Sequence, residues 1–382
     1  MVAVRPHDFP ADLLGAPLDR ARTLPGRWYA DPAHHALELD AIFRHHWVGA
    51  GCADDVAAPG AYLATHVGDV PVLVTRDDAG ELRAFLNVCR HRGSPLAAGC
   101  GQARALSCPY HAWLYRLDGS LARAGGVGQP VNFDVDDFGL RPVQVTTFAR
   151  SLLVNVDLDA APFDPGPLAA GLTPYALDEL ELGRRSRYER RFNWKVLLEN
   201  YCENYHTPFL HAQLPTAGYE YPIEVAGPAV FAWDRPLDPH GPAQQALHDH
   251  RPGDDGWSAV AATAADEPFN DGTYLAVFPN TAISCFAGFA ATFRLVPTGP
   301  STTVVEREYY WHPDVPAERR DADVAATELV VEQDLAMCEA LQRTYDAGLS
   351  ADGVLSTAHE AGVAHVHQLV LAALGHRSGD TA

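Results

Sequence analysis

Two short stretches of the chain each place one cysteine close to one histidine. Cys89 is two residues before His91 in the stretch CRHRG, and Cys108 is three residues before His111 in the stretch CPYHAWLY. Thiolate sulfur and imidazole nitrogen are ligands that bind transition metals in proteins. Both pairs stand next to turn residues at the ends of apolar runs, so we expect two loops of one β scaffold to hold a single metal centre between them.

Two kinds of metal centre use two cysteine and two histidine ligands. A structural zinc site needs them in a tetrahedral array, and zinc-finger spacings usually pair cysteine with cysteine and histidine with histidine. A Rieske [2Fe-2S] cluster instead places two thiolates on one iron and two imidazoles on the other. Because each stretch provides one ligand of each type, the pattern favours the Rieske cluster, with zinc as the alternative. The other cysteines have no histidine partner at matching spacing and are expected to be packed thiols: Cys52, Cys100, Cys202, Cys285 and Cys338.

A second group of candidate ligands lies in the stretch NWKVLLENYCENYHTPFLH. Glu203 and His206 are three residues apart, so they are neighbours on one face of the helix expected after Asn193. His211 is five residues beyond His206, and Pro208 between them is expected to break the helix, which would let both imidazoles converge. Two imidazoles and one carboxylate, with open coordination positions, form the facial triad of non-haem Fe(II) oxygenases.

The carboxylate of such a triad must come from another segment. Residues 318–348 form a long helical pattern in which Asp334 stands among apolar residues, where an unpaired charge would be costly to bury. Glu332 is the competing ligand, but it lies two residues earlier and so points to roughly the opposite side of the helix. The pattern favours Asp334 as the ligand, and the remaining interpretation is that both are surface charges. The apolar pattern consists of Leu329, Val330, Leu335, Met337 and Leu341.

The elements that must position these ligands follow from the periodicity of the sequence. From about residue 45 to residue 158, β-branched runs alternate with turn residues, and three breaks predict turns between strands: Gly68-Asp69, Asp77 to Gly80, and Asp118-Gly119. Ahead of them, Asp31 and Pro32 start a helical pattern that reaches Trp47. After them, a stretch rich in proline and alanine is expected to link to a second domain, in which residues 273–313 are predicted to form further strands.

Composition limits the classes of partner. The chain has 382 residues, enough for two or more domains, and 47% of them are hydrophobic, as in globular proteins. Its net charge of -21 argues against nucleic acid or an anionic membrane as a partner. The first residues lack the apolar core of a secretory signal, and no apolar run approaches the roughly 18 residues of a membrane span. We therefore expect a cytoplasmic protein.

These motifs together resemble the oxygenase component, or α subunit, of the Rieske non-haem iron oxygenases. The similar segments are CRHRG, CPYHAWLYRLDG, NWKVLLENYCENYHTPFLH and EQDLAMCEALQ, and the resemblance covers nearly the whole chain. It implies an α+β fold with an all-β Rieske [2Fe-2S] domain, residues 45–160, and a larger catalytic domain, residues 161–382, whose antiparallel sheet is flanked by helices. Residues 1–44 are then an N-terminal helical segment that packs on the catalytic domain.

The resemblance also implies a role for each candidate residue. It assigns the cluster to Cys89, His91, Cys108 and His111, and the mononuclear Fe(II) to His206, His211 and Asp334. It further implies a head-to-tail homotrimer, in which a carboxylate joins the cluster of one subunit to the iron of the next. That carboxylate corresponds to Glu203, and Asn200 is expected to lie near the iron. Glutamate departs from the aspartate of most ring-hydroxylating dioxygenases and is similar to the subgroup that acts on choline, carnitine and betaine-like amines.

The implied activity is an O2-dependent hydroxylation of a small organic molecule, with dealkylation when the oxidised carbon is next to nitrogen or oxygen. Electrons come from NAD(P)H through a separate reductase or ferredoxin, since the chain lacks the G-x-G-x-x-G loop of a dinucleotide-binding module. A quaternary or methylated amine and an aromatic or natural-product substrate both remain open, because aromatic residues suit either. Another alternative is a non-catalytic Rieske electron carrier. The candidate pocket residues are Tyr201, Tyr205, Phe209, Trp233, Tyr274, Phe286 and Phe289.

Overall fold

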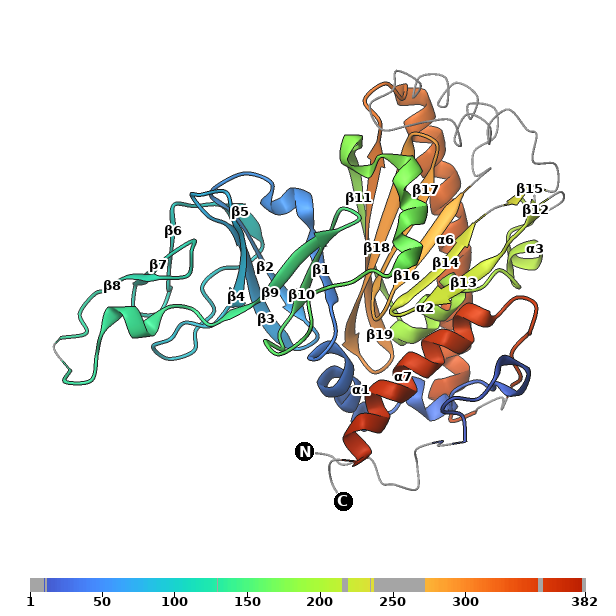
Figure 1. Ribbon diagram of the computed structural model, residues 1–382, viewed down its shortest axis with the longest axis horizontal. Helices are drawn as coiled ribbons and strands as arrows, with labels where there is room; N and C mark the ends of the chain where they lie inside the picture. The colour runs from blue at the N-terminus through green and yellow to red at the C-terminus, as the bar shows by residue number, and fades with distance from the viewer. Residues whose placement is uncertain are drawn as a thin grey trace. The chain divides into compact units, whose positions relative to one another are not determined.

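The computed structural model describes residues 10, 12–128, 130–214, 219–233, 235–236, 272–349 and 353–379. It contains two compact units, one formed by residues 43–163 and the other by residues 1–42 together with 164–382 (Figure 1). The first unit is built mainly from strands, and the second combines an antiparallel sheet with helices, so the predicted α+β fold is confirmed. Among the described residues, no helix has the length and apolarity that a membrane crossing requires.

The unit of residues 43–163 contains two antiparallel sheets. One has seven strands in the order β1-β10-β9-β4-β3-β2-β5, and the other has the order β6-β7-β8. The strands are β1 (Val48–Cys52), β2 (Ala61–Val67), β3 (Val70–Arg76), β4 (Leu82–Leu86), β5 (Cys100–Gln102), β6 (Ala105–Ser107), β7 (Trp113–Arg116), β8 (Leu121–Ala124), β9 (Pro142–Phe148) and β10 (Ser151–Asn155). Two short 3-10 helices, Ala53–Val56 and Val135–Phe138, complete the unit.

The turn residues predicted from the sequence join neighbouring strands of this unit. Gly68-Asp69 connects β2 to β3, and Asp77 to Gly80 connects β3 to β4. Between β7 and β8, the Asp118 side chain accepts a hydrogen bond from the backbone N–H of Ser120 at 2.8 Å, and Gly119 has a φ of +86°. Glycine adopts this left-handed conformation without the steric cost that other residues meet. The three predicted turns are therefore confirmed.

The second unit is organised around a seven-stranded antiparallel sheet. Its order is β11-β19-β18-β17-β16-β14-β13. The strands are β11 (Glu181–Arg190), β13 (Ile223–Ala226), β14 (Ala229–Trp233), β16 (Thr273–Val277), β17 (Thr281–Phe286), β18 (Phe289–Gly299) and β19 (Thr302–Trp311), and a separate pair is formed by β12 (Tyr219–Glu220) and β15 (Arg235–Pro236). The strands predicted between residues 273 and 313 are thus confirmed.

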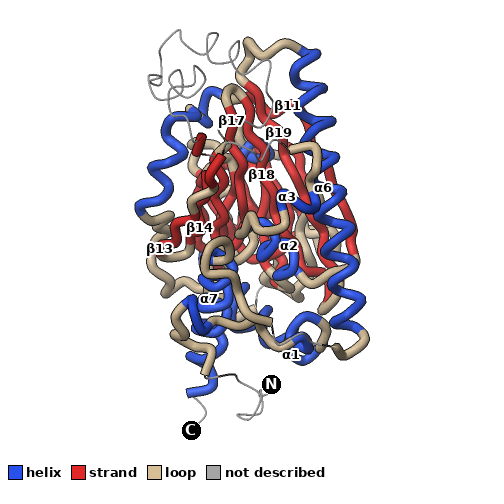
Figure 2. Tube along the Cα trace, turned by 90° about the vertical axis from the view of Figure 1, so that its right-hand side faces the viewer, coloured by secondary structure: helices blue, strands red, loops and turns tan. Residues whose placement is uncertain are grey.

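Helices cover this second sheet. Figure 2 shows α2 and α3 in front of one face of the sheet, with the long helix α6 beside them. The helices are α1 (Pro32–Glu38), α2 (Trp194–Tyr201), α3 (Thr207–Leu210), α6 (Ala317–Asp346) and α7 (Ala361–Gly379), with a π-helix at Leu39–Phe43 and 3-10 helices at Leu18–Arg20, Gly26–Tyr29, Pro167–Tyr175 and Leu177–Glu179. The 3-10 helix Pro167–Tyr175 lies in the proline- and alanine-rich stretch that was predicted to link the two domains.

The N-terminal segment is tied to α2 through buried charges. Asp31 caps α1 by accepting a hydrogen bond from the N–H of Ala33 at 2.8 Å, as predicted, but helical structure ends at Phe43 and not at Trp47. Glu38 at the end of α1 is fully buried and pairs with the Lys195 ammonium, which is also fully buried. A buried charge is tolerated only when it is paired and hydrogen-bonded, so this contact fixes the N-terminal segment against α2.

The long helix α6 differs in one respect from its predicted apolar pattern. Leu335 is fully buried, but Leu329, Met337 and Leu341 are exposed. The buried side of α6 is more polar than the pattern suggested, because it includes Thr327 and Gln342. Hydrogen bonds from the Gln342 amide to the carbonyl of Tyr29 at 2.9 Å and to Ser301 at 3.0 Å make its burial possible.

Candidate metal centres

The candidate cluster ligands lie on two loops of the β unit. Cys89 and His91 follow β4, and Asn87 closes the base of their loop by accepting from the N–H of Leu96 and donating to the carbonyl of Ala97, both at 2.9 Å. The N–H of Gly93 donates to the Cys89 carbonyl at 2.9 Å, and the φ of Gly93 is +77°. This turn requires a left-handed residue, and glycine supplies it.

The second loop turns between β6 and β7. Cys108 directly follows β6, and its N–H donates to the carbonyl of Trp113 at 2.8 Å. Both candidate thiols are buried in the core of the unit, whereas His91 is exposed and His111 is half-exposed. Burial raises the pKa of Cys108, but hydrogen bonds from the N–H groups of Tyr110 and His111 outweigh it and lower that pKa overall. Those N–H donors favour the thiolate, which is the form that binds metal.

The two candidate histidines converge at the tips of the loops. Nδ1 of His91 lies 3.1 Å from Nδ1 of His111, and the His91 ring is stacked on Trp113 with a centroid distance of 4.9 Å. Two nitrogen lone pairs in such proximity are suited to one shared metal ion. The two thiols are buried and the two imidazoles lie at the surface. This donor set fits a [2Fe-2S] cluster in which one iron is bound by two thiolates and the other by two imidazoles.

The second candidate centre is assembled from α6 and the segment around α3. The helix α2 begins after Asn193, as predicted, and Asn193 caps it by accepting from the N–H of Lys195 at 3.1 Å, but α2 ends at Tyr201. Glu203 and His206 therefore lie in the turn between two helices and not on one helical face. Pro208 stands in the first turn of α3, so it begins a helix where a break was expected. The Glu203 carboxylate accepts from the N–H of His206 at 3.2 Å, which stabilises this turn.

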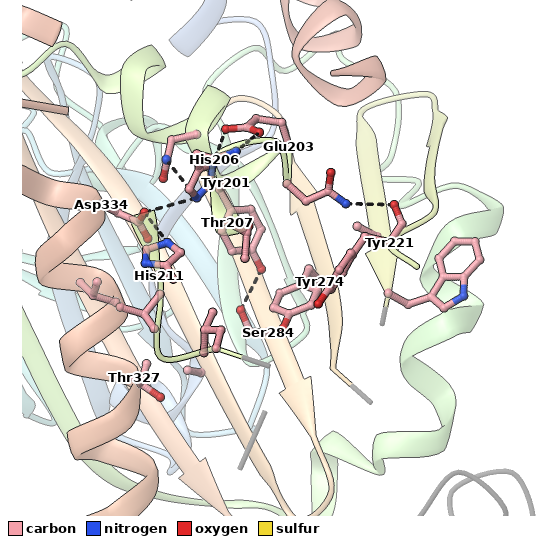
Figure 3. A pocket seen from close by; sticks show the side chains of 18 of the residues that line it. Tyr201, Glu203, His206, Thr207, His211, Tyr221, Tyr274, Ser284, Thr327 and Asp334 are labelled. Carbon is pink, nitrogen blue, oxygen red and sulfur yellow. Dashed lines mark hydrogen bonds and ion pairs between the residues drawn. The ribbon is translucent and has the colours of Figure 1, made fainter. Parts of the chain in front are cut away.

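Three side chains meet where these elements come together. Asp334 Oδ1 lies 3.0 Å from His211 Nε2 and 3.5 Å from His206 Nε2, and all three ligand atoms lie within 4.8 Å of one another (Figure 3). Glu332 is exposed and pairs with Arg190, so of the two competing carboxylates only Asp334 faces the histidines.

Hydrogen bonds orient both imidazoles toward Asp334. His211 Nδ1 lies 2.7 Å from the side-chain oxygen of Gln333, and His206 Nδ1 contacts the Glu203 carboxylate. Because both acceptors are oxygens, the neutral form of each ring carries its proton on Nδ1, and its Nε2 lone pair is then available to a metal. Oxygen acceptors behind metal-binding histidines fix the ring orientation in the same way. Both Nε2 atoms face the same carboxylate.

The electrostatics of the group are those of a cation site. Burial lowers the pKa of His206, but Asp334 and Glu203 outweigh it and raise that pKa to about 9. Burial raises the pKa of Asp334, but the two histidines outweigh it and lower that pKa. Asp334 Oδ1 is buried and accepts no well-formed hydrogen bond from the residues that the structure describes. A divalent ion between the two imidazoles would satisfy this oxygen, so the three residues fit a mononuclear iron.

A cavity of about 190 Å³ opens beside this group. Asn200 lines it, and its side-chain nitrogen lies 3.5 Å from His206 Nε2. Tyr201 and Tyr274 line it further from Asp334, with the Tyr201 hydroxyl 2.9 Å from Ser284 Oγ (Figure 3). One row of side chains across the sheet contributes to its wall. The row consists of Ile223, Ala232, Tyr274, Ser284 and Ala291, each opposite the next in the strand register.

The predicted pocket aromatics are only partly correct. Tyr201, Trp233, Tyr274 and Phe286 line the cavity. Tyr205 and Phe209 are instead exposed, by 51% and 80% respectively, and Phe289 is buried in a stack with Trp311. The prediction about free thiols is wrong for Cys100, which is exposed on β5, whereas Cys52, Cys202, Cys285 and Cys338 are buried.

Two residues at this site were missed by the sequence reasoning. Gln333 gave no signal, because a glutamine on a helix is most often a surface residue. Arg307 did have a recognisable signal in the sequence, because it stands between Val305 and Tyr309 in a strand whose alternate residues are apolar. The period of two places Arg307 on the same side of the sheet as these buried residues.

Comparison with known proteins follows the division into two units. Residues 46–136 match the family described as "Rieske [2Fe-2S] domain", and residues 177–376 match "Ring hydroxylating alpha subunit (catalytic domain)". The chain is 30% identical to chloroplastic choline monooxygenase of Beta vulgaris over 94% of its own length and 78% of the relative. It is 28% identical to the glycine betaine monooxygenase oxygenase subunit of Pseudomonas aeruginosa, over 92% and 89% of the two chains.

A solved structure is similar over almost the whole chain. The quaternary ammonium Rieske monooxygenase CntA in complex with L-carnitine has a TM-score of 0.77 and 25% sequence identity, and the match covers 97% of this chain and 99% of that one. The match extends over both units of the fold.

Proposed function

The chain belongs to the Rieske oxygenases, a family of oxidoreductases with a Rieske [2Fe-2S] domain and a catalytic domain, and we propose that it hydroxylates a small quaternary or methylated amine. The names of the relatives support this substrate class, since they act on choline, glycine betaine and carnitine. Five aromatic side chains in the cavity support it further, because aromatic faces attract quaternary ammonium groups.

The first centre would be held by Cys89, His91, Cys108 and His111. Support comes from the 3.1 Å separation of the two Nδ1 atoms and from the lowered pKa of Cys108. When bound, the cluster supplies electrons one at a time, which it receives from an NAD(P)H-dependent reductase or a ferredoxin. The exposed imidazole of His91 and the half-exposed one of His111 are accessible to such a partner.

The second centre would be held by His206, His211 and Asp334, and it supplies the binding and activation of O2 when iron is present. The main support is that these three ligand atoms converge within 4.8 Å and that hydrogen bonds to Nδ1 orient both imidazoles with Nε2 toward Asp334. Asn200 limits the open side next to His206, and the cavity beside the three ligands would hold the substrate. In the overall reaction, one oxygen atom enters a C–H bond and the other leaves as water, using the electron pair of NAD(P)H.

Glu203 has a separate role in this proposal. Its carboxylate accepts a hydrogen bond from His206 Nδ1 and is 11% exposed, so part of it is accessible to a second donor. We place it between His206 and the partner subunit's His111 in a head-to-tail homotrimer. A carboxylate that accepts a hydrogen bond from an imidazole on each side couples the protonation of the two centres.

Metal analysis tests the proposal most directly. The oxygenase is expected to contain one iron atom beyond those of its sulfide-bridged cluster, whereas an electron carrier would contain only the cluster iron and a zinc protein would be colourless. With a reductase, NADH and O2, methylated amines are expected to give oxidised product in step with NADH consumption. Product from aromatic compounds alone would refute the amine assignment.

A further inference from the structure

Arg307 on β19 faces the same side of the sheet as the cavity wall. In the strand register Ser284 is opposite Ala291, and Ala291 is opposite Tyr309. Arg307 is two residues before Tyr309 and therefore points to the same face, one row further along the strand. Its side chain lines the cavity together with Tyr201 and Asp334.

The Arg307 guanidinium forms no salt bridge in the part of the chain that the structure describes, although the Glu328 carboxylate is close enough to interact with it electrostatically. The residue is only 8% exposed, and its buried Nε has no hydrogen-bond partner there. Its Cζ lies 5.4 Å from the ring centroid of Tyr309, and the hydroxyl group of the same tyrosine also interacts with the guanidinium. The Glu328 carboxylate on α6 is occupied by hydrogen bonds from Ser186 at 2.9 Å and from Tyr309 at 2.6 Å.

A buried charge that is only partly compensated is costly, and arginine is suited to bind a carboxylate through two parallel hydrogen bonds. Because the guanidinium lines a cavity and forms no salt bridge with the described residues, a ligand can provide a directly bound anion. We infer that Arg307 binds a carboxylate of the substrate, so that the substrate is a betaine: a methylated ammonium group and a carboxylate in one small molecule. This inference rests on the proposed amine oxidation and narrows it.

The same charge argues against choline as the substrate. Choline has an ammonium group but no anion, and it would add a further cation to a cavity of about 190 Å³ whose lining already includes Arg307. A betaine adds no net charge. Its carboxylate neutralises Arg307, and its ammonium group can contact the aromatic rings of Tyr201, Tyr274 and Phe286. Glycine betaine carries a carboxylate where choline carries a hydroxymethyl group, and the two molecules are otherwise identical. They are therefore a matched pair of probes.

The test is calorimetric titration of the iron-loaded enzyme, without O2, with glycine betaine, choline and benzoate. We expect the wild type to bind glycine betaine at least about tenfold more tightly than choline. Arg307→Gln is expected to weaken glycine betaine binding about 10- to 100-fold and to leave choline binding unchanged or stronger. Arg307→Lys should lose less affinity than Arg307→Gln, because it keeps the charge but not the two parallel donors.

The control is Arg187→Gln, which removes an exposed arginine that pairs with Glu189 on the neighbouring strand β11 and should change neither affinity. Iron content and thermal midpoint verify that each variant is folded. If choline binds as tightly as glycine betaine and both Arg307 variants bind like the wild type, the carboxylate inference fails while the amine oxygenase stands. If neither amine binds but benzoate does, the proposed amine function fails, and the betaine inference fails with it.

Discussion

His211 Nδ1 lies 2.7 Å from the side-chain oxygen of Gln333, the residue directly before Asp334 on α6. A single helix therefore provides both the candidate carboxylate ligand and the acceptor that fixes the tautomer of a candidate histidine ligand. The Gln213 amide donates to the same oxygen at 2.8 Å and holds it in place. Positioning residues of this kind affect metal affinity without touching the metal.

Gln333→Leu tests this role. Loss of the acceptor frees the His211 ring to rotate, so we expect roughly 10- to 100-fold weaker iron binding, measured by titration with a competing chelator. The visible bands of the cluster should not change. Glu332→Leu is the matched control, since this residue neighbours Gln333 but pairs with Arg190. Equal iron loss in both variants would show that a general disturbance of α6 is responsible.

Asp334→Ala tests the carboxylate ligand itself. We expect this variant to lose the iron that is not part of the cluster while its acid-labile sulfide is unchanged, because only the buried, unsatisfied Oδ1 is removed. Elemental analysis after gel filtration measures both. Iron retained in Asp334→Ala but lost in Glu332→Ala would reverse the choice of ligand.

Glu203→Gln tests the proposed coupling between centres. The amide preserves the size of the side chain but replaces one carboxylate oxygen by an NH2 donor. Only the remaining oxygen can then accept a hydrogen bond from an imidazole N–H, such as that of His206 Nδ1, so the side chain cannot accept from an imidazole on each side. We expect full metal content and a coupled turnover reduced at least about tenfold. Rapid-mixing measurement of cluster reoxidation, with Glu224→Gln on the exposed side of β13 as the control, checks this. Unchanged reoxidation would remove Glu203 from the electron path.

Lys195→Met tests the buried pair that holds the N-terminal segment. It leaves the fully buried Glu38 without its cation, so we expect a loss of about 3–5 kcal/mol in the free energy of unfolding. Adding Glu38→Leu should recover much of this loss. Arg44→Met, which breaks the exposed pair with Asp69, should cost no more than about 1 kcal/mol. Urea denaturation measures all three, and equal effects at both pairs would contradict the role of burial.

The same pair gives the stability a defined dependence on pH. Burial acts to raise the pKa of Glu38, but Lys195 and His34 outweigh it and lower that pKa to about 2, from an ordinary value of 4.5. Because the folded-state pKa is depressed, this contribution is complete above pH 4.5 and is lost as the pH falls toward 2. The wild type should therefore lose stability relative to the Glu38→Leu/Lys195→Met double variant between pH 5 and pH 3, and the difference in their urea midpoints should change accordingly. The size of this change should be of the same order as the contribution of the Glu38–Lys195 pair to the free energy of unfolding. A constant difference would contradict the depressed pKa.

Local features of this protein could be predicted from its sequence. The turns at Gly68-Asp69 and Asp118-Gly119 follow from the conformational preferences of adjacent residues, and so does the cap at Asp31. The candidate ligands were recognisable because their residue types and short spacings are rare in combination. Each of these features depends on a few neighbouring residues.

The remaining features depend on contacts between distant segments. Gln333 meets His211 across 122 residues of sequence, and no local pattern marks that pair. Leu329 and Met337 have the composition of a buried face, yet the sheet instead covers the side of α6 that includes Thr327. Glu203 and His206 pair as expected, but through a turn, since α2 ends before either residue.

The division of the chain has a consequence for how the protein is made. Residues 43–163 interrupt a unit whose first part, with Glu38, is synthesised well before Lys195. During translation, Glu38 in the N-terminal segment cannot pair with Lys195 until the intervening unit and α2 have left the ribosome. A fragment that begins after residue 163 would lack Glu38 altogether, so the isolated catalytic unit would have to be expressed as a fusion in which residue 42 is joined to residue 164.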